Sequence, residues 1–147
     1  MRAVQVLAVL FTVISLIPGG AHVLEFHRKI TFSADNYLMV QSLYTGWAFI
    51  GMAIFAALAL NGTAAIMLKG QGTPFQWELA ATVLLVVSLA IFFIWTFPVN
   101  QTTANWTRLP PNWAALRRQW EYSHLANAAV VFASLVCVTV SMAVTKR

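Results

Sequence analysis

Two short segments combine a histidine and a glutamate at helical spacing. His22 precedes Glu25 by three residues, and Glu121 precedes His124 by three residues in the reverse order. Residues three apart share one face of a helix, so each segment presents a carboxylate and an imidazole side by side. Helical bundles use such Glu-x-x-His turns to hold metal ions. Two histidines with one or two carboxylates suit a single iron, manganese or zinc ion, so these four residues form a candidate metal site.

The same four residues allow interpretations without a metal. A histidine beside a carboxylate can act as a general acid or base. Each glutamate also lies three residues from an arginine, which is Arg28 in the first segment and Arg118 in the second, so both carboxylates could form simple ion pairs near the membrane surface. A haem held by His22 and His124 as axial ligands is a further, less favoured alternative. The residue types alone leave these alternatives open.

The elements that position these residues are predicted to be transmembrane helices. The chain is 60% hydrophobic and 9% charged, whereas about 25% of the residues of a soluble domain are charged. Its charges leave four uncharged runs, at residues 3–24, 36–68, 79–107 and 122–145. Each run can contain the roughly 20 apolar residues that cross a bilayer as a helix. We therefore predict helices at about residues 3–24, 43–68, 75–97 and 112–144.

The predicted fold is all-α, an integral membrane four-helix bundle with up-down-up-down topology and both termini on the same side. The four helices use most of the chain, which indicates a single domain over residues 1–147. Helix four carries polar or aromatic residues at every seventh position, a spacing typical of an inward packing seam. The seam residues are Trp113, Trp120, Asn127, Ser134 and Ser141. The expected location is the cell (inner) membrane, with the lipid bilayer as the main partner.

One end of this bundle holds most of the groups that can do chemistry. The topology brings all three histidines, all three tyrosines and three of the four acidic residues to one membrane side. Ionisable groups in membrane helices are a functional hypothesis by default. The nine Lys and Arg residues lie near the ends of the apolar runs, where they meet lipid headgroups, so the net charge of +5 indicates no nucleic-acid partner. The single Cys137 excludes the membrane thiol oxidases that need cysteine pairs.

Two motifs in the second half of the chain resemble those of a known family. They are Phe97-Pro98-Val99-Asn100 at the end of helix three and Arg117-Arg118-Gln119-Trp120-Glu121-Tyr122-Ser123-His124 at the start of helix four. Both are similar to the Pro-x-Asn and Arg-x-Trp-x-x-x-His motifs of the anthrone-oxygenase-like family of small four-helix membrane proteins. Ala21-His22-Val23-Leu24-Glu25 also resembles one bacterial branch of that family. The matching motif positions are Pro98, Asn100, Arg118, Trp120 and His124.

The resemblance implies an oxidoreductase that converts anthrones to anthraquinones with molecular oxygen, although most members of the family have no assigned activity. His124 is the implied base that removes a proton from the substrate, with Glu121 or Asn100 fixing its tautomer. The resulting anion can react with oxygen directly, so either no cofactor is required or a single metal ion takes part. A flat lipophilic substrate would lie against aromatic side chains. The candidate substrate-binding residues are Trp47, Trp95, Trp120 and Arg118.

The alternative function is that of a non-catalytic accessory subunit, which packs its aromatic end against the other membrane protein subunits of a larger complex. An enzyme predicts a polar pocket inside the bundle. An accessory subunit predicts that His22 and His124 are turned apart or covered by other side chains. For the enzyme, we expect the four residues of the two His/Glu segments to lie close together near one membrane face. We also expect the loss of His124 to reduce activity most.

Overall fold

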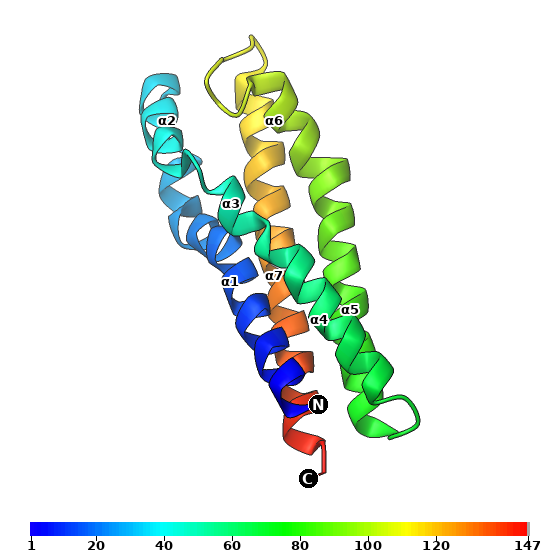
Figure 1. Cartoon of the computed structure of the whole chain (residues 1–147). Helices are drawn as coiled ribbons and strands as arrows, with labels where there is room; N and C mark the ends of the chain where they lie inside the picture. The colour runs from blue at the N-terminus through cyan, green and yellow to red at the C-terminus, as the bar shows by residue number, and fades with distance from the viewer. Residues whose placement is uncertain (147) are drawn as a thin grey trace.

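The computed structural model describes residues 1–146, which are largely helical and include no strand (Figure 1). In chain order the elements are α1 (Arg2–Lys29), α2 (Ala34–Gln41), η1 (Ser42–Tyr44), α3 (Ala48–Gly51), α4 (Ala53–Met67), α5 (Thr73–Ile91), η2 (Phe92–Thr96), α6 (Phe97–Thr103) and α7 (Trp113–Val144). Four segments are long and apolar enough to cross a membrane: α1, α3 with α4, α5 through α6, and α7. This confirms the predicted all-α membrane bundle.

Successive spans run in opposite directions, and both termini lie at the same end of the bundle (Figure 1). α1 packs against α4 and α7, and α5 packs against the same two helices. The first and last spans are also joined near the termini. The Arg2 guanidinium donates hydrogen bonds to the carbonyl oxygens of Met142, at 2.9 Å, and Thr145, at 2.8 Å. The last helix therefore closes the bundle against the first.

The connection between the first two spans, for which the sequence predicted no helix between residues 24 and 43, contains the helix α2. The side chain of Ser33 caps its start by accepting a hydrogen bond from the backbone N–H of Asn36. The chain then turns at Gly46, whose φ of 88° is a left-handed conformation that glycine adopts without steric cost. The second span consequently begins at Ala48, later than the predicted residue 43.

The third span extends to Thr103 instead of ending at Phe97 as predicted. Pro98 has no N–H to bond the carbonyl of the preceding turn, which would break a regular α-helix. Here the π-helical turn η2 precedes the proline, and Pro98 itself lies in the first turn of α6, where proline is tolerated. π-turns of this kind often occur at functional positions. This one packs against α7.

The chain leaves α6 through three consecutive non-glycine residues in the left-handed conformation. Ala104, Asn105 and Trp106 have φ angles of 49°, 54° and 61°. Each such residue costs roughly 1–2 kcal/mol, so other contacts must offset the strain. The N–H of Asn105 donates to the carbonyl of Asn100 at 2.7 Å, and the N–H of Trp106 donates to Oγ1 of Thr103 at 3.1 Å. The turn places the Trp106 side chain, which is only 4% exposed, inside the bundle.

Small and polar side chains fill the interior, and many large apolar side chains face outward. Four alanines have no exposed surface: Ala8, Ala57, Ala64 and Ala81. Phe49 and Ile66, by contrast, are 85% and 76% exposed. Lipid is as apolar as a protein core, so membrane helices associate through close packing and polar contacts. A β-carbon placed on Gly19 would lie only 3.1 Å from Cβ of Ala128, which shows how closely α1 approaches α7.

Polar side chains on the predicted seam of helix four make contacts across the bundle. Ser134 donates to the carbonyl of Ala81 at 2.9 Å, and Ser141 donates to the carbonyl of Pro74 at 2.9 Å. Both serines are fully buried. The seven-residue pattern therefore identified part of the face of α7 that meets α5.

Candidate functional site

Lys29, the last residue of α1, lies at the centre of the candidate site. Its ammonium nitrogen is 2.7 Å from Nδ1 of His22 and 3.2 Å from Oε1 of Glu121. It is also 3.4 Å from Oε2 of Glu25, whose side chain is 42% exposed. His22, Glu25 and Lys29 follow one another at spacings of three and four residues, so one face of α1 presents all three. One cation therefore joins the two His/Glu segments predicted from the sequence.

Two tyrosines also donate hydrogen bonds to the carboxylates. Tyr37 donates to Oε1 of Glu121 at 2.9 Å, and Tyr44 donates to Oε2 of Glu25. The Lys29 ammonium also donates to the Tyr44 hydroxyl at 3.2 Å. Burial and the neighbouring Glu121 carboxylate raise the pKa of Tyr37 above its ordinary value. The Tyr37 hydroxyl therefore keeps its proton and remains a donor.

Lys29 and Glu121 form a buried ion pair. Their side chains are 2% and 0% exposed. Removing two charges from water costs several kcal/mol per ion, which is offset only by close pairing and further hydrogen bonds. Oε1 of Glu121 has two such partners, whereas Oε2 has none among residues 1–146. An unsatisfied oxygen on a buried carboxylate needs an explanation, and a functional role is one that such groups often have.

A second cation, Arg117, holds the chain after α1 against α7. Its Nη1 donates to the carbonyl of Phe32 at 2.6 Å. The guanidinium carbon lies 4.7 Å from the centre of the Trp113 ring and 5.5 Å from that of the Tyr37 ring. Cation–aromatic contacts contribute about 0.5–2 kcal/mol each. Arg117 thereby helps to hold Tyr37 against Glu121.

The two imidazole rings pack against each other beside the ion pair. The ring centres of His22 and His124 are 4.3 Å apart, with 41° between the planes. Trp120 lies edge-on to both rings, at 4.7 Å and 4.2 Å. Because the Lys29 ammonium donates to Nδ1 of His22, the neutral ring carries its proton on Nε2. Nε2 of His124 is buried without a hydrogen-bond partner among residues 1–146, although the residue as a whole is partly exposed.

Asn100 positions Trp120. Its Oδ1 accepts a hydrogen bond from Nε1 of Trp120 at 2.6 Å, which joins α6 to α7. Trp106 supports Trp120 from another side, with ring centres 5.9 Å apart. The sequence predicted that Asn100 or Glu121 fixes the tautomer of His124. Neither residue hydrogen-bonds His124. Asn100 accepts from Trp120, and Glu121 accepts from the Lys29 and Tyr37 side chains.

The structure brings the four residues of the two His/Glu segments together but separates the candidate substrate-binding residues. Trp47 contacts Tyr44 with ring centres 5.0 Å apart, and Tyr44 contacts His22 at 4.6 Å, so Trp47 belongs to the same aromatic cluster as Trp120. Trp95 is 38% exposed, and Arg118 is exposed as well. Both lie on the outer surface of the bundle.

Sequence reasoning missed Lys29, because it assigned the cations at helix ends to lipid headgroups. A signal was available, since Lys29 follows Glu25 by four residues and His22 by seven and therefore shares their helix face. The simple ion pairs considered with Arg28 and Arg118 are not formed. In the described part of the chain, both ion pairs belong to Lys29.

The arrangement does not fit the metal ion considered from the sequence. The Lys29 ammonium fills the space between His22, Glu25 and Glu121, where a shared cation would have to lie. Within residues 1–146, no group of three or more His, Cys, Asp or Glu side chains is arranged to hold a metal. A haem does not fit either, because the macrocycle would have to lie between His22 and His124, whose ring centres are 4.3 Å apart.

The geometry is suited to proton transfer. An imidazole nitrogen without a hydrogen-bond partner can act as a general base. A nearby buried ammonium can stabilise negative charge that develops on a bound molecule.

Comparison of the chain with known proteins found no matching family model, no matching curated protein and no matching solved structure.

Proposed function

We propose that the chain is an oxidoreductase of the cell (inner) membrane that acts on a small, flat, lipophilic substrate, as its resemblance to anthrone-oxygenase-like proteins implies. One observation carries the proposal. Nε2 of His124 is buried without a partner among residues 1–146, next to the His22 ring. Burying a polar nitrogen without a hydrogen bond destabilises a protein, so a purely structural histidine would normally be paired. His124 is therefore the proposed base.

The proposed reaction exploits the acidity of a methylene group between two aromatic rings. His124 takes a proton from the methylene carbon, and the electron pair left behind is delocalised onto the ketone oxygen of the substrate. The anion adds molecular oxygen at the carbon and recovers the proton as a hydroperoxide. Loss of water from the hydroperoxide forms the new carbonyl group. One methylene and one oxygen molecule thus give one ketone and one water, with oxygen as the only oxidant.

The surrounding residues support this chemistry. The Lys29 ammonium, 2.7 Å from Nδ1 of His22, offsets the charge of the Glu121 and Glu25 carboxylates, so an anion formed beside the imidazole rings meets less repulsion. Trp120 and Trp47 provide flat apolar surfaces in the same cluster. The proposal requires a lipophilic molecule from the bilayer to reach Nε2 of His124; the residue is partly exposed within a membrane span, although this nitrogen itself is buried.

Replacement of His124 by glutamine tests the proposal. Glutamine keeps a hydrogen-bonding side chain but cannot cycle a proton near neutral pH. We expect a normal yield of folded protein and a loss of about 100-fold or more in anthrone-dependent oxygen consumption, the usual contribution of a general base. His27→Gln is the matched control, since His27 is exposed near the end of the same bundle. Full activity in His124→Gln would refute a catalytic role.

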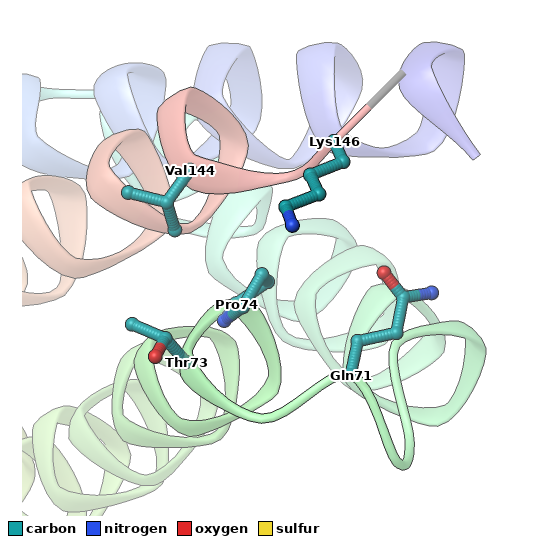
Figure 2. A pocket seen from close by; sticks show the side chains of 5 residues that line it. All are labelled: Gln71, Thr73, Pro74, Val144 and Lys146. Carbon is teal, nitrogen blue, oxygen red and sulfur yellow. The ribbon is translucent and has the colours of Figure 1, made fainter.

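One observation favours the alternative of a non-catalytic accessory subunit. Trp120 covers both imidazole rings, and the hollow shown in Figure 2 lies at the opposite end of the bundle, beside Pro74 and Lys146. An accessory subunit would need the Lys29 cluster only for packing. The same His124→Gln measurement separates the two functions, because a packing residue can change the yield of folded protein without selectively removing an activity.

A further inference from the structure

Glu78, on α5, is a buried acidic residue at the end of the bundle that carries the termini. Its side chain has no exposed surface. Neither of its carboxyl oxygens has a hydrogen-bond partner among residues 1–146. Both ion pairs among residues 1–146 involve Lys29, which lies at the opposite end of the bundle. The structure thus places a carboxyl group inside a membrane span without a described counter-charge.

Ser141 lies within reach of the Glu78 carboxyl group, but its hydroxyl proton is engaged elsewhere. Ser141, on α7, donates its hydroxyl proton to the carbonyl of Pro74, one turn before Glu78 on the same helix. Gln5, on α1, donates its amide to Thr145, and its buried Oε1 has no partner among residues 1–146. At this end of the interior, the acceptor oxygens of Gln5 and Glu78 are thus left without donors among residues 1–146. An ionised carboxylate would add a further acceptor, whereas a protonated carboxyl group supplies a donor.

Charged groups on the neighbouring elements at this end lie at the helix termini. Arg2 of α1 is engaged with the carbonyl oxygens at the end of α7. Lys69 follows α4 and is exposed, and Lys146 follows α7. None of these three forms an ion pair with Glu78 within the described residues. Cys137 of α7, which is also buried in this half of the bundle, supplies no positive charge.

A hollow opens to the surface close to Glu78. Its volume is about 550 Å³, and it is lined by Gln71, Thr73, Pro74, Val144 and Lys146 (Figure 2). Glu78 lies four residues after Pro74 on the same face of α5, which is about 6 Å deeper along the helix. Water in the hollow can therefore approach the carboxyl group to within about one helical turn.

An ionised carboxylate is not stable in such a place. Isolated charge in a low-dielectric interior is so costly that the group binds a proton instead. A hard cation such as sodium or calcium would need several oxygen ligands. Within residues 1–146, Glu78 belongs to no group of acidic, histidine or cysteine side chains that could hold a metal.

We propose that Glu78 is a proton-binding site, a carboxylic acid at neutral pH that exchanges its proton with water in the adjoining hollow. Ionisable residues inside membrane spans often mark such proton sites. The site shares no residue with the Lys29 cluster and lies at the other end of the bundle, so it does not depend on the proposed oxidation.

A hydrophobic carbodiimide tests the proposal, because it reacts with protonated carboxyl groups in apolar surroundings. The acid adds across a C=N bond of the reagent, and migration of the acyl group from oxygen to nitrogen leaves a stable N-acylurea. A glutamate with the ordinary pKa of about 4.3 is protonated in only about one molecule in 500 at pH 7. We therefore expect Glu78 to be labelled at neutral pH about 100-fold faster than such a glutamate. Mass spectrometry of the detergent-solubilised full chain would locate the adduct.

Two variants and a second measurement complete the test. Glu78→Gln should abolish the label, and Glu25→Gln, which changes a half-exposed glutamate at the other end, should leave it intact. Infrared spectra of the wild type at neutral pH should show the carbonyl band of a protonated carboxyl group, which does not depend on access of the reagent. Absence of that band would overturn the proposal. Protection from labelling by sodium or potassium at constant pH would also overturn it, since the site would then bind a metal cation.

Discussion

Replacing Lys29 by methionine is expected to destabilise the protein through Glu121 rather than through lost packing. Methionine has a similar length and adapts to its surroundings, so the change in packing is small. The Glu121 carboxylate, which is 0% exposed, would lose the ammonium that lies 3.2 Å away. Removing one partner of a buried ion pair costs about 3–5 kcal/mol, because the other charge remains buried and unpaired. We expect a loss in that range.

A double variant separates this effect from packing. Glu121→Gln removes the charge but keeps an oxygen that can accept the Tyr37 hydrogen bond, now 2.9 Å long. With Glu121→Gln already present, Lys29→Met no longer leaves that carboxylate unpaired. The free energies of the single changes should therefore not add, and the double-mutant cycle should give a coupling energy of about 2–3 kcal/mol.

The unfolding free energy in detergent micelles, followed by circular dichroism, is the quantity to measure. Lys69→Met is the matched control, since Lys69 is an exposed lysine at the other end of the bundle. A surface change of this kind normally shifts stability by no more than about 0.5 kcal/mol. Equal losses of unfolding free energy in Lys29→Met and Lys69→Met, or strict additivity in the double-mutant cycle, would show that Lys29 does not stabilise the protein by pairing with Glu121.

Two further changes test the packing of α1 against α7 and the protonation of Tyr37. Gly19→Leu should lower the unfolding free energy by about 1–3 kcal/mol through overpacking against α7. Gly20→Leu should not, because a β-carbon at that position meets nothing within 4 Å. Equal unfolding free energies for the two variants would contradict the close approach of α1 to α7. Folding raises the pKa of Tyr37 above the ordinary tyrosine value of about 10. The contribution of Tyr37 to stability is therefore complete below that pH and is lost as the pH rises further, because the unfolded chain ionises first. The stability advantage of the wild type over Tyr37→Phe should therefore shrink in alkaline solution, and a constant advantage would argue against a retained proton.

The membrane fold could be predicted from the sequence because the bilayer allows few solutions. An uncharged run of about 20 residues must cross as a helix, since lipid cannot satisfy the backbone N–H and C=O groups. Helix ends were harder to predict. Pro98 suggests a helix end by the rules for soluble proteins, yet the π-turn before it lets the third span continue to Thr103. The helix α2 was missed because its eight residues are too few to cross a bilayer, which was the criterion for the other helices.

The candidate site was only partly predictable. The spacing of His22 and Glu25 showed that they share a face of α1, but spacing along one helix does not tell how that helix is rotated toward its neighbours. Lys29 therefore looked like an ordinary headgroup lysine until the structure placed it against Glu121. Tyr37 lies in the segment expected to be a loop, so its contact with Glu121 had no detectable signal in the sequence. These partners are set by tertiary packing.

The pairing of the first helix with the last has a consequence for biosynthesis. When α1 enters the membrane, Glu121 has not yet been synthesised, so Lys29 lacks its partner on α7 and has only His22 and Glu25 on its own helix. A lysine at a helix end can extend its charge to the headgroups meanwhile, because its long apolar stem lies along the helix. The ammonium can become buried only after α7 has inserted and docked against α1. The Lys29 cluster is thus completed at the final stage of membrane insertion, and a chain that stops before Glu121 cannot assemble it.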